Sequence, residues 1–397
     1  MSHSPSRWQH VVLIIGILLI GMNLRPSITA LSALAERMHY DGLSRETIGS
    51  LTTIPLILFG VVGLWAGWIG KLMGFARALG LGLFLIGIGC WIRSLPGDVE
   101  IFSRFGGTIL LGAGIALGNV VLPGLVKSRY PNHVGILTSL YATSMNLGAA
   151  CGIAFSVPLA ELLPGGWRSA LAAWGGFAII VLLLWSPQMF ARPTTRKSEH
   201  PLAGVMVLAK QIRAWQVAAF MGLQSWVFYC SVAWLPTLLQ SKGMAETTAA
   251  NWVVGMQLLG CAASLTIPTL AGRSKSQSSW VVGCALFNVV GLTGTLLLPG
   301  IWQIISLLIL GLGLNAGFGL VLLLIPLRSK NPETAASLSS MAQAAGYLFS
   351  SPGPWLVGLL STTAGGWPLA FGVVIGIAVL GGIAGFLAGR PGELSLD

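Results

Sequence analysis

Hydrophobic positions along this chain fall into twelve long blocks separated by short polar segments. Each block holds about 20 residues or more, which is the length a helix needs to cross the hydrocarbon core of a bilayer. The pattern therefore predicts an all-α integral membrane protein with twelve transmembrane helices. The predicted spans are 9–36, 46–70, 76–94, 102–126, 134–160, 167–187, 214–240, 247–271, 279–298, 302–326, 333–360 and 367–389.

Composition and charge agree with this class. Hydrophobic residues make up 54% of the 397 residues and charged residues only 8%, far below the roughly 25% of a soluble domain. With the N-terminus inside, 15 of the 22 basic residues fall in inner segments, six in outer segments and Arg25 within a span. This bias predicts that both termini are cytoplasmic. The net charge of +11 is then a topology signal and an anionic-lipid contact, so we expect no nucleic acid partner.

The two halves of the chain resemble each other. The segment Gly112-Ala-Gly114-Ile-Ala-Leu-Gly118 recurs as Gly311-Leu-Gly313-Leu-Asn-Ala-Gly317, and Gly165-Gly166-Trp167 recurs as Gly365-Gly366-Trp367, at offsets of 199 and 200. Such a repeat is typical of transporters built from two halves that are related by an axis along the membrane normal. Chance likeness between glycine-rich apolar segments is the alternative.

A polar break divides the twelve blocks six and six. It runs from Pro187 to Gln211 and is rich in Arg, Lys, Thr and Ser. We therefore predict an N-terminal six-helix bundle over 1–187, a cytoplasmic linker over 188–212 and a C-terminal six-helix bundle over 213–397. In this architecture the binding site lies between the two pseudo-symmetric bundles.

Arg25 is the one charged residue deep inside a hydrophobic block. An arginine near the bilayer centre costs roughly 2.5–3.5 kcal/mol on insertion scales, which is tolerated where it serves a purpose. Pro26 follows it and removes a backbone donor, which predicts a break in the first helix. No Asp, Glu or His lies at similar depth. This favours a substrate with negative charge or electron-rich oxygens, although Arg25 bonded only to Met22 and its neighbours is the structural alternative.

Several segments resemble one branch of the major facilitator superfamily, the cyanate and 2-nitroimidazole transporters. They are Met22-Asn23-Leu24-Arg25-Pro26, the stretch from Gly114 to Lys127, Trp234-Leu235-Pro236, and Met341-Ala-Gln343-Ala-Ala-Gly346-Tyr347. The resemblance implies a multi-pass transporter of the bacterial inner membrane that acts by alternating access. The stretch from Gly63 to Gly74 departs from the common facilitator signature, because it holds no acidic residue.

Neutral polar residues at mid-depth are the other candidates for a binding site. The resemblance favours those on the helices that line the cavity of this superfamily, although each alone is more often an interhelical hydrogen bond. Three aromatic residues, Trp226, Phe228 and Trp234, could add flat apolar walls. The predicted substrate-binding residues are Arg25, Asn119, Tyr229, Gln257, Gln343 and Tyr347.

The predicted function is secondary active or facilitative transport of a small anionic, nitro- or carboxylate-bearing polar compound. Energy would come from the substrate gradient or from protons, carried with the substrate or by a boundary acid such as Glu36 or Glu161. We expect a monomer in the lipid bilayer and no cofactor, metal or enzyme activity, because no nucleotide or metal-ligand motif occurs. The alternatives are a multidrug-type proton antiporter and a membrane sensor that binds ligand without transporting it.

Overall fold

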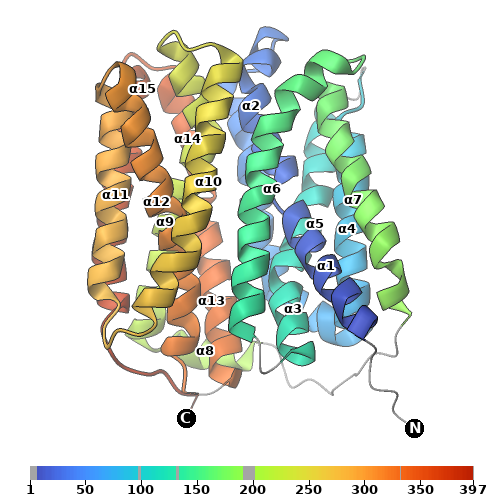
Figure 1. Ribbon diagram of the computed structural model, residues 1–397, viewed down its shortest axis with the longest axis vertical. Helices are drawn as coiled ribbons and strands as arrows, with labels where there is room; N and C mark the ends of the chain where they lie inside the picture. Colours follow the sequence, from blue (N-terminus) through green and yellow to red (C-terminus); the bar gives the residue numbers. More distant parts are fainter. Residues whose placement is uncertain (1–6, 97–99, 131–133, 191–201, 331, 397) are drawn as a thin grey trace.

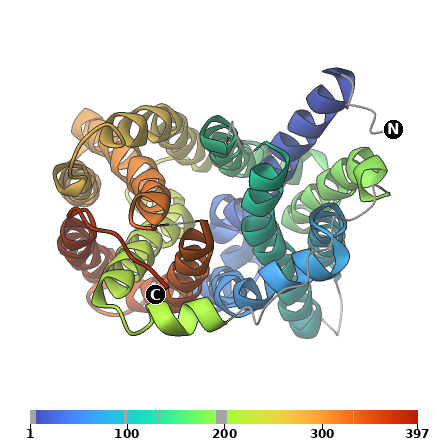
Figure 2. The same cartoon turned by 90° about the horizontal axis from the view of Figure 1, so that it is seen from below.

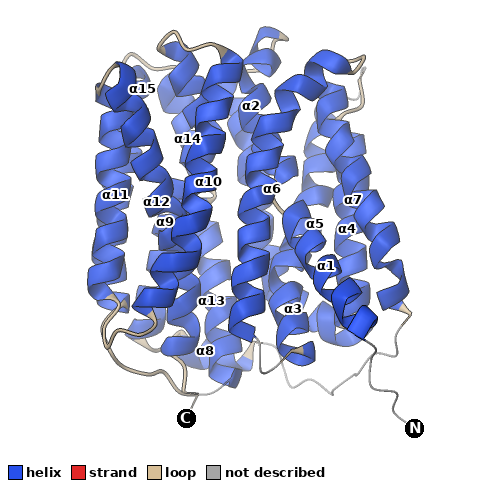
Figure 3. Cartoon of the chain, in the orientation of Figure 1, coloured by secondary structure: helices blue, strands red, loops and turns tan. Residues whose placement is uncertain are grey.

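The chain folds into a bundle of long helices, described by a computed structural model over residues 7–96, 100–130, 134–190, 202–330 and 332–396 (Figures 1 and 3). Both termini lie at one end of the bundle, the bottom of Figure 1, which we call the termini end. The opposite end is called the distal end. The helices are α1 (Arg7–Asn23), α2 (Pro26–Tyr40), α3 (Arg45–Met73), α4 (Phe75–Arg93), α5 (Glu100–Arg129), α6 (Val134–Leu162), α7 (Trp167–Met189), α8 (Ala203–Leu208), α9 (Ile212–Ser241), α10 (Glu246–Ala271), α11 (Ser278–Leu297), α12 (Gly300–Leu327), α13 (Pro332–Ser350), α14 (Pro352–Ser361) and α15 (Gly366–Ala388).

The helices account for all twelve predicted spans. Within the described residues, eleven segments are long and apolar enough to cross a membrane, and the first of them, His10–Tyr40, contains both α1 and α2. The remaining predicted span, 333–360, is divided between α13 and α14. Neither of these two helices alone combines the length and the hydropathy of a spanning segment. The sequence pattern therefore predicted the span but not its division into two helices.

The spans form two bundles that pack by the same scheme. In one half α4 packs against α5 and α7, and in the other half the corresponding α11 packs against α12 and α15. The halves meet where α6 contacts α10 and where α3 contacts α13 and α14. Figure 2 shows the two groups of helices side by side, seen from the termini end. The predicted fold of two pseudo-symmetric six-helix bundles is thus confirmed.

The predicted domain boundaries remain a prediction. Most of the proposed linker, residues 191–201, lies outside the described residues. Its described remainder includes the short helix α8, which contacts α13.

The first span is interrupted at mid-depth, as Pro26 predicts. Helix α1 ends at Asn23 and α2 begins at Pro26, with Arg25 in the non-helical position between them (φ −122°, ψ −38°). The carbonyl of Arg25 still accepts from the amides of Ile28 and Thr29, at 3.0 and 3.1 Å. The break therefore displaces the chain without leaving the start of α2 unsatisfied.

Two glycines of α6 allow its backbone to approach this break. A side chain at Gly148 would overlap the carbonyl of Met22, and one at Gly152 would overlap Pro26 and Thr29. The hydroxyl of Thr29 donates to the carbonyl of Ala149, at 3.0 Å. Non-helical backbone at membrane depth is tolerated where protein covers it, and here α6 supplies that cover.

The two halves are broken in different spans. The counterpart of the first span, α9, continues through Pro236 without interruption. The interruption in the second half instead separates α13 from α14, at Ser351. Next to it, Gly353 lies so close to Trp226 and Cys230 of α9 that a β-carbon would fall within 3.0 Å of both. Each half thus contains a span that is divided into two helices, α1 and α2 in the first half and α13 and α14 in the second.

We predict that Gly148→Ala destabilises the protein, because the added methyl group meets the backbone of the broken first span. Overpacking of this kind costs about 1–3 kcal/mol, so the thermal unfolding temperature of the purified protein should fall. Gly176→Ala in α7 is the matched control, since its methyl group would meet no atom within 4 Å. Equal unfolding temperatures for the two variants would contradict the close approach described here.

Candidate functional site

The guanidinium of Arg25 lies buried at the break in the first span, with 3% of the residue exposed. Its central carbon lies 4.8 Å from the ring centre of Phe228 and 5.5 Å from those of Tyr229 and Phe318. Phe228 and Tyr229 belong to α9 and Phe318 to α12, so residues of the second half surround a cation of the first. Arg25 therefore lies at the interface of the two halves.

The three rings around Arg25 offset the free-energy cost of burying its charge, but they leave two of its N–H donors without hydrogen bonds. A cation–π contact contributes about 0.5–2 kcal/mol, so three of them offset much of the cost of burying an arginine. Nε and Nη1 of Arg25 are buried and form no hydrogen bond within the described residues. No ion pair with a carboxylate is found there either. The site thus presents N–H donors that could form hydrogen bonds to two electron-rich oxygens of a ligand.

Two further predicted site residues join this cluster. The ring centres of Tyr229 and Tyr347 lie 6.3 Å apart, and both rings contact Phe59 of α3, at 6.4 and 5.3 Å. The hydroxyl of Tyr229 is buried without a hydrogen-bond partner in the described part of the chain. Arg25, Tyr229 and Tyr347 therefore belong to one aromatic site, in which α2, α3, α9, α12 and α13 take part.

The other three predicted residues lie in different surroundings. Asn119 is half-buried in α5, next to Gly118, which packs against Leu24 of the broken span. Gln343 is half-buried in α13 and donates to Ser339, at 2.9 Å. Gln257 is fully buried in α10 and accepts from Asn315, at 3.2 Å. Their part in substrate binding stays a prediction.

Gln257 belongs to a set of buried amides that joins four helices of the second half. Gln224 of α9 donates to the carbonyl of Leu314, at 2.9 Å, and accepts from Asn288 of α11, at 3.2 Å. Asn315 of α12 donates to Gln257. Gly317 and Gly260 make room, because a β-carbon at either would overlap Gln224 or Asn315. Glycines on α10 and α12 thus leave room for amide side chains between the helices.

Of the three rings around Arg25, the sequence singled out Phe228 and Tyr229 but not Phe318. Phe228 lies against the guanidinium, whereas Trp226 packs on Phe349, at 5.5 Å, and Trp234 on Trp367, at 6.0 Å. Phe318 was not anticipated. It lies one residue after the Gly311–Gly317 repeat, which was the available signal, because that repeat marks the part of α12 that packs at mid-depth.

Arg93 is a second buried arginine that the sequence placed at a span end. It is 2% exposed in the last turn of α4, and none of its three side-chain nitrogens has a hydrogen-bond partner in the described residues. Its backbone packs against Gly107 of α5. Its burial arises within the first half, away from the interface, so we do not assign it to the site.

A charged cluster connects the two halves at the distal end. Arg37 of α2 donates from Nε and Nη2 to both oxygens of Glu246 in α10, at 2.7 to 3.0 Å, and from Nη2 to Glu161 of α6, at 2.8 Å. The side chains of Arg37 and Glu246 are 30% and 23% exposed. We call these three residues the distal latch. Nearby, Thr362 donates to Glu46 across the same interface, at 3.4 Å.

The boundary acids suggested as proton carriers are both in ion pairs. Glu36 pairs with Arg45, at 3.2 Å, and Glu161 pairs with Arg37 in the distal latch. A proton bound by Glu161 would weaken the ion pair between Glu161 and Arg37. The arrangement can therefore bind an anion at the centre and hold the halves together at one end.

Two related halves of membrane-spanning helices are the architecture of many secondary transporters. Residues 13–354 match the Major Facilitator Superfamily, and the chain belongs to that superfamily. It is 40% identical to the uncharacterized transporter YycB of Bacillus subtilis over 388 residues, which cover 95% of this chain and 93% of the relative. It is 37% identical to the 2-nitroimidazole transporter of Escherichia coli, over 99% of both chains.

A more distant relative and a solved structure support the same assignment. The cyanate transport protein CynX of Escherichia coli is 25% identical over 92% of this chain and 94% of its own. The crystal structure of a bacterial homolog of the human lysosomal transporter Spinster, in an inward-facing and unoccupied conformation, superposes with a TM-score of 0.79. It covers 97% of this chain and 98% of its own at 14% identity, which is a likeness of fold. The predicted resemblance to the cyanate and 2-nitroimidazole transporters is confirmed.

We predict that Glu246→Gln loosens the distal end more than Glu161→Gln does. Glu246 accepts three of the four hydrogen bonds that Arg37 donates in the latch. A partly exposed ion pair contributes about 0.5–1 kcal/mol, so backbone amides of 30–40 and 246–252 should exchange with deuterium a few-fold faster. Hydrogen exchange followed by mass spectrometry measures this. Equal exchange in wild type and Glu246→Gln would show that the latch does not hold the halves.

Proposed function

We propose that this protein moves small planar anions, or nitro- or carboxylate-bearing ring compounds, across a bacterial inner membrane, with Arg25 as the anchoring residue. One observation carries the proposal. Arg25 is buried between the halves, its charge is balanced by ring faces, and Nε and Nη1 have no hydrogen-bond partner in the described residues.

The chemistry of the surroundings favours a flat, electron-rich substrate. The planar guanidinium can bond two oxygens of a carboxylate or nitro group at once. The rings of Phe228, Tyr229 and Tyr347 offer apolar faces against which a planar ring could stack, a contact that contributes about 0.5–1.5 kcal/mol beyond its buried area. Similarity to transporters named for 2-nitroimidazole and cyanate supports this choice.

Alternating access is the proposed mode of action. The distal latch would close the site toward one side of the membrane, and its opening would let the halves rock about Arg25. The excess of basic residues at the termini end supports a cytoplasmic location for both termini. Protons could reach the latch through Glu161, whose side chain is 55% exposed. We propose a monomer as the working unit.

We predict that Arg25→Gln weakens substrate binding about 10- to 100-fold, because hydrogen bonds to a charged group contribute about 1.5–3 kcal/mol. Arg25→Lys keeps the charge but loses the planar pair of donors, so its loss should be intermediate. Thermal-shift titrations of the purified protein with 2-nitroimidazole, benzoate and cyanate measure the affinities. Arg129→Gln, an exposed arginine, is the charge-matched control.

The same titrations separate the proposal from its rivals. A folded Arg25→Gln protein that binds all three compounds as wild type does would overturn the site. A broad range of cationic or neutral ligands with no dependence on Arg25 would favour a multidrug-type antiporter. Binding without uptake into proteoliposomes would favour a sensor.

We predict that Tyr229→Phe changes the unfolding temperature little, because the buried hydroxyl that it removes makes no hydrogen bond of ordinary geometry in the described residues. If the hydroxyl bonds substrate, affinity should fall severalfold in the same variant. Lower stability with unchanged affinity would assign Tyr229 a structural role only.

A further inference from the structure

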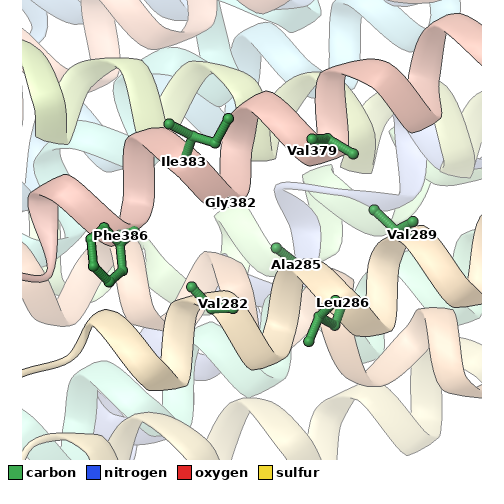
Figure 4. A pocket seen from close by; sticks show the side chains of 8 residues that line it. All are labelled: Val282, Ala285, Leu286, Val289, Val379, Gly382, Ile383 and Phe386. Carbon is green, nitrogen blue, oxygen red and sulfur yellow. The ribbon is translucent and has the colours of Figure 1, made fainter.

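A groove on the outside of the second half lies between α11 and α15 (Figure 4). Its volume is about 410 Å³, and all eight side chains or backbone positions that line it are apolar. The groove is deepest at Gly382, which has no side chain and lies against the methyl group of Ala285. Larger residues such as Leu286 and Ile383, 57% and 56% exposed, form the walls.

The groove has the length of part of one bilayer leaflet. It extends over eight residues of each helix, from Val379 to Phe386 and from Val289 to Val282, which is about 10 Å at a rise of 1.5 Å per residue. Phe386 and Val282 lie close to the ends of α15 and α11 at the termini end. The groove therefore occupies the half of the membrane nearest the termini and is too short to accept a spanning helix along its whole length.

Basic residues surround the end of this groove. The guanidinium carbon of Arg390 lies 5.1 Å from the ring centre of Phe386, which lines the groove. Lys275 and Arg273 lie in the loop before α11. This loop is fixed to the end of α15, because Ser276 and the amide of Gln277 both donate to the carbonyl of Gly389, at 3.1 and 3.0 Å.

The three basic side chains are available to a partner. Arg273, Lys275 and Arg390 are exposed, and none of them is in an ion pair within the described residues. Basic pockets between transmembrane helices are suited to anionic lipid headgroups. An apolar groove with three exposed basic side chains near its end matches both parts of such a lipid.

We propose that the groove between α11 and α15 binds one anionic phospholipid. An acyl chain lies over Gly382 and Ala285, and the phosphate is held by Arg390 with Lys275 and Arg273. The assignment is independent of the transported substrate, because the groove is lined by α11 and α15 and neither helix contributes a residue to the aromatic site around Arg25.

The test compares phosphatidylglycerol with phosphatidylcholine of identical acyl chains, added to the purified full-length protein. Native mass spectrometry measures how much of each lipid is retained, and thermal shifts measure the stabilisation. Wild type should retain phosphatidylglycerol preferentially. Arg390→Gln should reduce this preference about fivefold, as expected for one basic group near the surface, while phosphatidylcholine retention stays unchanged. Lys210→Gln, which removes an exposed charge elsewhere at the termini end, should change neither.

The groove itself is tested by filling it. Gly382→Leu should reduce retention of both lipids, whereas Gly376→Leu on the same helix, where a side chain meets open space, should not. Should Gly382→Leu fail to fold, Ile383→Gln places a polar group in the groove from an exposed position. Equal lipid retention by wild type, Arg390→Gln and the groove variants would overturn the proposal. Loss of a dimer on filling the groove would overturn it too, in favour of a second copy of this chain.

Discussion

The burial of one guanidinium between two helix bundles is the constraint on which the centre of this structure depends. Arg25 cannot lie at mid-membrane without compensation, and within the described residues no carboxylate pairs with it. The compensation comes from ring faces on α9 and α12 of the opposite half. The charge of Arg25 thus holds the two halves together at their interface. Because ring faces accept no conventional hydrogen bond from Nε and Nη1, these N–H donors remain free within the described residues.

The broken first span follows from the same constraint. Pro26 ends the regular helix and Gly148 and Gly152 of α6 bring backbone close enough to cover the gap. A continuous helix would point residue 25 along a helical face, whereas here Arg25 occupies the non-helical junction. In the second half, hydrogen bonds between buried amides such as Gln224 and Asn288 connect the helices. The duplicated scaffold therefore carries charge on one side and neutral hydrogen bonds on the other.

Polar contacts at the distal end complete the picture of two halves that meet at more than one level. Arg37 reaches across the interface to Glu246, whereas Glu161 belongs to its own half. Partly exposed ion pairs are weak, so such a contact can hold a conformation and still be broken during a transport cycle. Bonds of this strength suit a moving interface better than the buried aromatic contacts around Arg25 do.

The sequence alone predicts the class of protein, the positions of the twelve spans, the six-and-six repeat and the break at Pro26. These follow from local properties: block length, hydropathy, charge bias and the missing N–H of proline. It also singled out Arg25, because a charge in an apolar block is visible without any structure. The surroundings of Arg25, in contrast, follow from the packing of distant helices. Phe318 lies far from Arg25 in the chain, and so does Phe59, which packs on Tyr229 and Tyr347. These contacts depend on how the helices rotate about their axes, which near-uniformly apolar spans do not encode in their pattern. The same helix-to-helix packing decides three other features: the hydrogen bond between Asn315 and Gln257, the burial of Arg93, and the division of the span 333–360 at Ser351.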